Sequence, residues 1–112
     1  MSKFDECIET YEKEFKKLKV KSDPKLLRAV AKACGPSLYR ADASKVSSSD
    51  PEELKRVKKN FLIKKLGLKD GPKLDEGIAA VVKIMGAKNR NKYRAMVYYL
   101  LVKHFRKASV FK

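Results

Sequence analysis

The stretch of this sequence best suited to chemistry is a run of cations and amides before its last apolar segment. It comprises Lys88, Asn89, Arg90, Asn91, Lys92 and Arg94. We expect a helix to begin here, and the free N–H groups at a helix start attract anions. The run therefore predicts contact with a phosphate on nucleic acid or on a small ligand, although a helix cap at Asn91 with solvated cations explains the same residues.

A second cationic run lies on the outer face of an expected helix. Lys55, Arg56, Lys58 and Lys59 form this run, and two further lysines extend it to residue 65. Such a surface would contact phosphates diffusely, without reading bases. An ordinary solvated helix face is the alternative interpretation.

The charge of the whole chain supports an anionic partner. Its 112 residues carry a formal charge of +15, which predicts attraction to nucleic acid, to an anionic membrane or to an acidic protein. Residues 87–112 contain eight basic and no acidic residues. The chain lacks the spacing of zinc fingers, the aromatic segment of an RNA-recognition motif and a G-x-x-G loop, so the sequence predicts no base-reading module.

The sequence contains no recognisable catalytic constellation. His104 is its only histidine and lies on an apolar helical stripe, where we expect it to pack at the edge of the core. The serines lack a G-x-S-x-G frame, and the glycines form neither a P-loop nor a dinucleotide fingerprint. The chain is therefore predicted not to be an enzyme and to need no cofactor or metal.

Apolar periodicity predicts an all-α protein made of one domain over residues 1–112. Five main helices are expected at 2–20, 24–34, 51–66, 72–85 and 91–107, with short helical turns within 38–46. The last helix carries no charge from Ala95 to Val102, so it is predicted to be buried at the centre, and it is too short to span a bilayer. Phe111 is expected to fold back onto the surface.

Helix starts are marked by capping residues. Ser2, Asp23 and Asp50 are predicted N-caps, and Glu53 follows Asp50 at capping-box spacing. The first helix has apolar residues at steps of four, three, four and three, which fit packing on the core or against a partner helix. These residues are Phe4, Ile8, Tyr11, Phe15 and Leu18.

The two cysteines and the N-terminal residues suggest a cellular setting. Cys7 and Cys34 fall in different helices and are expected to be reduced, partly buried thiols, with a disulfide as the alternative. The first residues lack the apolar run of a signal peptide. A soluble cytoplasmic protein is the expectation.

Three segments resemble a known family. They are GPSLYRADA at 35–43, SDPEELKRVKKNFLIKKLGL at 49–68 and NRNKYRA at 89–95, followed by a YYLL run and an SVF ending. The sequence is similar to small bacterial proteins catalogued as domain of unknown function twenty-eight fifty-three. The resemblance implies a compact helical array in a stand-alone protein and transfers no site residues. Typical members of this family are much less basic, so the charge belongs to this chain or its lineage.

Three functional hypotheses follow. The first is a protein-interaction module or a homodimer, formed through the first helix or the aromatic residues near the end. The alternative is nucleic-acid binding without base specificity through the basic surfaces at 55–65 and 88–94. The third is an enzyme or small-anion binder at 89–94, which requires a pocket there.

Overall fold

The fold is built from five α-helices in the part of the chain that the structure describes. This computed structural model describes residues 2–40, 45–46, 50–86 and 92–111. The α-helices are α1 (Lys3–Lys17), α2 (Pro24–Cys34), α3 (Pro51–Arg56), α4 (Pro72–Met85) and α5 (Arg94–His104). A π-helix, η2 (Val57–Ile63), continues α3, and 3-10 turns occupy η1 (Gly35–Tyr39) and η3 (Ala108–Phe111). The all-α prediction is confirmed.

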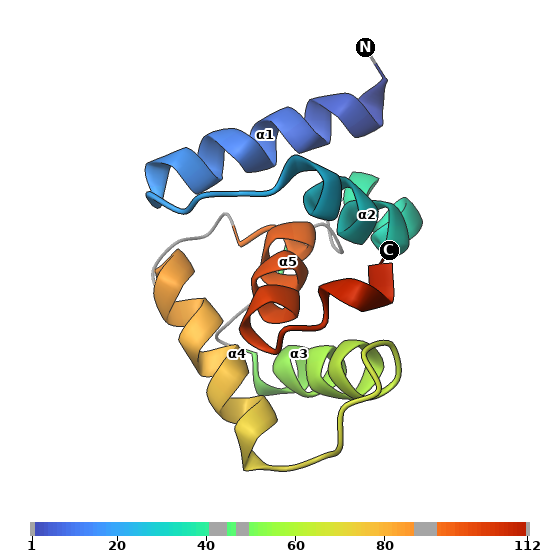
Figure 1. Ribbon diagram of the computed structural model, residues 1–112, viewed down its shortest axis with the longest axis vertical. Coiled ribbons are helices and arrows are strands. Elements are labelled where there is room, and N and C mark those ends of the chain that lie inside the picture. Colours follow the sequence, from blue (N-terminus) through green and yellow to red (C-terminus); the bar gives the residue numbers. More distant parts are fainter. Residues whose placement is uncertain (1, 41–44, 47–49, 87–91, 112) are drawn as a thin grey trace.

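Helix α5 lies at the centre, with α1 and α2 on one side and α3 and α4 on the other (Figure 1). Seven of its residues are buried: Ala95, Met96, Val97, Tyr99, Leu100, Leu101 and Val102. A helix enclosed on both sides needs apolar residues around most of its circumference, which explains its uncharged sequence. The predicted buried C-terminal helix is confirmed.

Helix α5 is shorter at both ends than the predicted 91–107. At its start, the Val46 N–H donates to the Lys92 carbonyl oxygen at 2.7 Å, and Tyr93 pairs with Lys45 in a single antiparallel bridge. These residues are therefore extended. At its end, Arg106 has a φ of 55°, which no helix continues through. No glycine or proline in the sequence marks either end of α5.

The predicted caps are present. The side chains of Ser2, Asp23 and Asp50 each accept a hydrogen bond from a backbone N–H in the first turn of their helices. The Asp23 N–H also donates to the Tyr99 hydroxyl at 2.8 Å, so the start of α2 is tied to the central helix. The Asp23 carboxylate thus caps α2, and the Asp23 N–H attaches the start of α2 to Tyr99 of α5.

The apolar stripe of α1 is used in the core. Ile8, Tyr11 and Phe15 are no more than 2% exposed. The Tyr11 ring lies 5.3 Å from that of Tyr93, and Phe15 lies at the same distance from Tyr99. Of the two interpretations of this stripe, packing on the core is the one the structure shows.

The π-helix η2 was not expected from the sequence. Its wider turns appear as bonds from the Lys64 N–H to the Lys59 carbonyl at 3.2 Å and from the Leu66 N–H to the Phe61 carbonyl at 2.9 Å. Apolar side chains at Val57, Phe61 and Leu66 suit an α-helix or a π-helix equally well, so spacing could not reveal it.

The contact between α4 and the end of α5 gives a first prediction. A Cβ added at Gly77 would lie 2.7 Å from Phe105 Cε2, too close for ordinary packing. Alanine at an interior helix position normally stabilises by about 1 kcal/mol over glycine. We expect Gly77→Ala instead to lower the free energy of unfolding by about 1–2 kcal/mol, measured by urea denaturation. In a Phe105→Ala background the same change should be neutral or stabilising; stabilisation in the wild-type background would contradict this packing.

Candidate functional site

The basic run predicted at 55–59 is largely compensated by acids. Three of its four cations form ion pairs: Lys55 with Glu52, Arg56 with Glu53, and Lys58 with both Asp70 and Asp75. Hydrogen bonds to those two aspartates raise the pKa of the Lys58 ammonium. Lys59 is exposed and has no ion pair within the described ranges. An approaching polyanion would meet alternating charges here.

The basic run predicted at 88–94 lies only partly within the described residues. Lys88, Asn89, Arg90 and Asn91 lie outside the described residues. Lys92 is only 3% exposed, and burial lowers the pKa of its ammonium. The Lys92 side chain is therefore shielded from a ligand in solvent.

Arg94 connects the two predicted surfaces through Glu53. Arg94 Nη2 lies 2.6 Å from Glu53 Oε1, and Arg56 Nη2 lies 3.1 Å from Oε2 of the same carboxylate. The Arg94 and Glu53 side chains are only 16% and 14% exposed. The capping-box role predicted for Glu53 is wrong, because its carboxylate binds these arginines and leaves the Asp50 side chain to cap α3.

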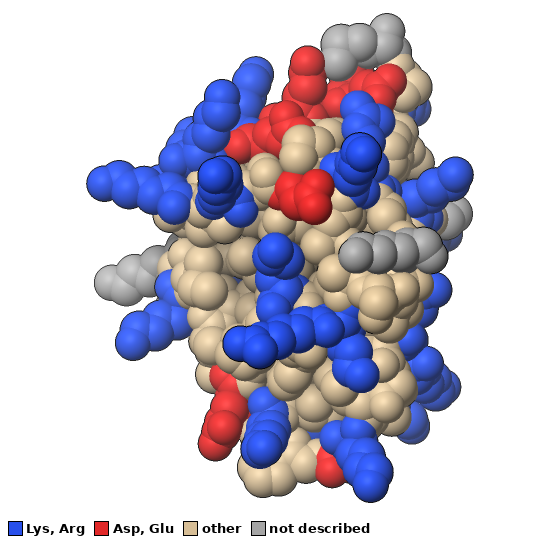
Figure 2. All heavy atoms as spheres, viewed as in Figure 1, with Lys and Arg blue, Asp and Glu red and all other residues tan. Residues whose placement is uncertain are grey.

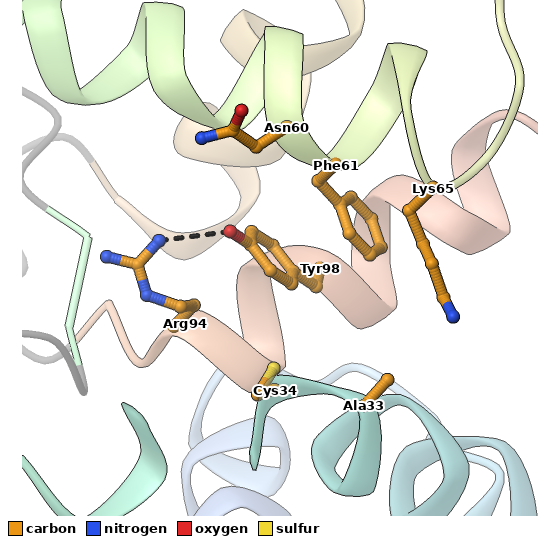
Figure 3. A pocket seen from close by; sticks show the side chains of 7 residues that line it. All are labelled: Ala33, Cys34, Asn60, Phe61, Lys65, Arg94 and Tyr98. Carbon is orange, nitrogen blue, oxygen red and sulfur yellow. Dashed lines mark hydrogen bonds between the residues drawn. The ribbon is translucent and has the colours of Figure 1, made fainter. Parts of the chain in front are cut away.

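A pocket opens beside Arg94. It has a volume of about 270 Å³ and is lined by Ala33, Cys34, Asn60, Phe61, Lys65, Arg94 and Tyr98. Figure 3 shows α2 below it, η2 above it, and α5 contributing Arg94 and Tyr98. Arg94 Nη1 donates to the Tyr98 hydroxyl at 3.0 Å. The third hypothesis required a concavity near 89–94, and this Arg94 pocket provides one.

The Arg94 pocket perturbs two titratable groups. Burial raises the pKa of the Cys34 thiol to about 11, and the nearby Arg94 charge offsets only part of this effect. Burial likewise raises the pKa of Tyr98, against the opposing charge and hydrogen bond of Arg94. Both groups are therefore neutral at pH 7. Cys34 and Cys7 are reduced thiols, each half-buried, as predicted.

The raised Cys34 pKa predicts slow alkylation. At pH 8 only about one thiol in a thousand would be ionised, since the thiolate fraction falls tenfold per pH unit below the pKa. In a Cys7→Ser variant, the iodoacetamide rate should rise steadily from pH 8 towards pH 11. The same variant in denaturant should titrate near 8.5. A native rate that levels off near that lower pH would exclude the burial effect.

A third basic surface surrounds the end of the chain. We define the C-terminal basic face as Lys25, Lys103, Arg106 and Lys107. None of these four side chains forms an ion pair in the part of the chain that the structure describes. Figure 2 shows Lys and Arg side chains over most of the visible face, whereas Asp and Glu lie mainly near α1, with a few at the lower edge and none across the middle. Counting charge by segment pointed to residues 87–112, but the sequence could not separate exposed cations from buried ones.

A groove runs through the C-terminal basic face. It has a volume of about 510 Å³ and lies between α2, the end of α5 and η3. Lys25 and Lys103 line it together with apolar residues that include Phe111. Asp23 is the acid at this groove, and its carboxylate caps α2. Phe111 also packs at 6.4 Å from the Phe61 ring, so the predicted return of Phe111 to the surface is confirmed.

His104 and the aromatic residues complete the account of the predicted residues. His104 is exposed at the end of α5, where the apolar stripe leaves the core, and its ring lies 4.8 Å from that of Phe105. Tyr99 is buried with its hydroxyl bonded, as expected for a core tyrosine.

Among the described residues, no group of three His, Cys, Asp or Glu side chains could hold a metal ion. No described helix has the length and apolar content needed to cross a membrane.

Comparison with known protein families gives one match. A model of the family described as "Protein of unknown function (DUF2853)" matches residues 10–109. The chain belongs to this family. A search of the curated proteins found no match. The family resemblance seen in the sequence is confirmed over nearly the whole chain, and family membership assigns no role to the Arg94 pocket or to the C-terminal basic face.

Proposed function

We propose that this protein binds the phosphate backbone of nucleic acid, without reading bases, through the C-terminal basic face. The observation that carries the proposal is the charge after Glu76. No acidic residue follows it in the sequence, and the Lys103, Arg106 and Lys107 side chains form no ion pair with any described residue. Uncompensated cations attract a polyanion and release its counterions on contact.

The position of this face distinguishes the proposal from the two surfaces predicted from sequence. At 55–59, carboxylates offset the cations, and the described part of 88–94 places Lys92 in the interior and pairs Arg94 with Glu53. Around η3 the positive charge faces solvent. Nucleic acid carries one negative charge per about 1.7 Å of duplex axis, so Lys25 and Lys103 at one groove, with Arg106 and Lys107 just after α5 in the chain, are proposed to meet several phosphates at once.

Membrane binding and protein interaction are less well supported. Binding to a membrane surface usually adds apolar side chains that insert among the lipids. The described residues expose three large hydrophobics, Tyr39, Ile84 and Val110, on three different elements. In the stripe of α1, Ile8, Tyr11 and Phe15 are buried and so are not available to a membrane or a partner. Self-association and protein interaction therefore stay predictions without an evident surface.

A binding role is also proposed in preference to a catalytic one. Of the ionisable groups at the Arg94 pocket, Arg94 is paired with Glu53, and Cys34 and Tyr98 are held neutral at pH 7, which leaves Lys65 as the cation without an ion pair to a described residue. A general base or nucleophile needs a pKa near the working pH or an adjacent activating group. His104 lies exposed at the end of α5, with no ion pair to a described carboxylate.

The salt dependence of DNA binding tests the proposed function. Fluorescence anisotropy with a short labelled duplex should show affinity that falls about a hundredfold between roughly 50 and 200 mM salt, as expected for about four phosphate contacts. A duplex of unrelated sequence should bind equally well. Affinity independent of salt, or binding to anionic vesicles but not to the duplex, would reject the proposal.

A further inference from the structure

The Arg94 pocket is distinct from the C-terminal basic face and has its own chemistry. Its volume of about 270 Å³ falls just below the usual range for small-molecule pockets, roughly 300–1,000 Å³. A ligand here would be smaller than a typical drug molecule. A nucleic-acid strand would not enter, although a single small group could.

One wall of the pocket is aromatic. The rings of Phe61 and Tyr98 are stacked, with centroids 3.9 Å apart and planes 13° apart. Phe61 comes from η2 and Tyr98 from α5, and the Ala33 methyl of α2 lies opposite (Figure 3). This wall suits a flat, apolar group, which would replace water against the rings.

The ends of the pocket are positive or hydrogen-bonding. Arg94 and Asn60 lie at one end, and Lys65 lies at the other, beyond Phe61 (Figure 3). No Asp or Glu lines the pocket. The Lys65 ammonium lies 5.6 Å from the Phe111 ring centroid and forms no ion pair among the described residues. An anion would gain favourable charge at the Lys65 end, because Glu53 already offsets the charge of Arg94 at the other end.

The π-helix η2 carries Asn60 and Phe61, and Lys65 follows in the turn after it, at the same opening. A π-turn holds about one residue more than an α-turn, so residues five apart come onto one face. Asn60 and Lys65 are five apart and both line the pocket, while Phe61 packs on Tyr98. A regular α-helix would turn Lys65 further round from Asn60. The irregular segment therefore builds the pocket, as π-turns at functional sites often do.

We propose that the Arg94 pocket binds a small organic anion, a carboxylate or phosphate carried on a flat apolar group. The ring lies against Phe61 and Tyr98, and the negative group faces the Lys65 ammonium. This site is independent of the proposed binding to nucleic acid, because it shares no residue with the C-terminal basic face. It explains why an exposed amide, an uncompensated lysine and stacked rings converge on one cavity.

The test uses phenyl phosphate and benzoate as probes, with benzyl alcohol and benzamidine as neutral and cationic controls. Amide NMR of nitrogen-labelled protein should show shifts at Cys34, Asn60 and Lys65 on addition of the anions at up to about 10 mM, corresponding to weak binding. Benzamidine should produce no saturable shifts. Absence of saturation with both anions would overturn the proposal.

Three variants separate the contributions. Lys65→Met should weaken the affinity for phenyl phosphate about three- to tenfold, which is the effect of one exposed charge contact. It should leave the affinity for benzyl alcohol unchanged. Lys64→Met removes the neighbouring exposed lysine, which does not line the pocket. It should change neither the affinity for phenyl phosphate nor that for benzyl alcohol. Ala33→Phe fills the cavity and should abolish binding of every ring compound.

The results also separate this site from DNA binding. Charge reversal of Lys103, Arg106 and Lys107 should leave phenyl phosphate affinity within about twofold of wild type, since exposed charges outside the pocket contribute little. Equal loss of phenyl phosphate and duplex in that variant would show that one general electrostatic attraction explains both, and would overturn a separate pocket site.

Discussion

Glu53→Gln should lower the free energy of unfolding by about 2–4 kcal/mol. The Glu53 carboxylate lies 2.6 Å from the Arg94 guanidinium, and both side chains are largely shielded from water. Glutamine keeps the shape but removes the negative charge, which leaves a shielded guanidinium without its carboxylate. The measurement is urea denaturation followed by circular dichroism.

The neighbouring residue provides a matched control for Glu53→Gln. Glu52 pairs with Lys55 at 3.8 Å, and those side chains are 71% and 74% exposed. Glu52→Gln should therefore change stability by less than about 0.5 kcal/mol. A double variant, Glu53→Leu with Arg94→Met, should recover much of the loss, because two apolar groups replace an ion pair. Equal effects of the Glu52 and Glu53 substitutions would contradict the role given to the buried pair.

Reversal of three charges on the C-terminal basic face should weaken duplex binding by at least about a hundredfold at low salt. The variant carries Lys103→Glu, Arg106→Glu and Lys107→Glu. It replaces three attractions with three repulsions at the surface proposed to meet phosphates. Fluorescence anisotropy measures the affinity, and circular dichroism checks that the helices remain.

A second triple variant controls for the change in net charge. Lys55→Glu, Lys59→Glu and Lys64→Glu alter the total charge equally but lie on the surface predicted from sequence at 55–65. This variant should weaken binding about tenfold or less, through longer-range effects that salt screens. If instead it removes binding and the C-terminal variant does not, the sequence-based surface is the correct one.

Much of the fold could be predicted because its signals are local. Asp23 followed by Pro24, and Asp50 followed by Pro51, mark helix starts through capping chemistry that acts over three residues. The uncharged stretch of α5 predicted its burial. Helix ends were harder to predict, because Lys19 and Arg106 adopt positive φ values that are unusual outside glycine. The π-helix was missed since apolar spacing does not distinguish it.

The candidate sites depend on contacts between distant segments, which no local pattern specifies. Glu53 appeared to belong to a cap because it follows Asp50 by three residues, but its partner Arg94 is 41 positions away. The Arg94 pocket combines α2, η2 and α5. Charge counting located the basic part of the chain correctly, whereas the burial of Lys92 depends on tertiary packing. A single sequence shows which residues are charged but not which of their side chains are exposed.

The most direct test of the proposed function is to map where a DNA duplex touches the protein. Amide NMR of nitrogen-labelled protein, titrated with a short unlabelled duplex at low salt, reports the contacted residues. We predict that the largest shifts occur at Lys25 and at residues 103–107, with little change at 55–59. Shifts centred on 55–59, or no saturable shifts, would contradict binding through the C-terminal basic face.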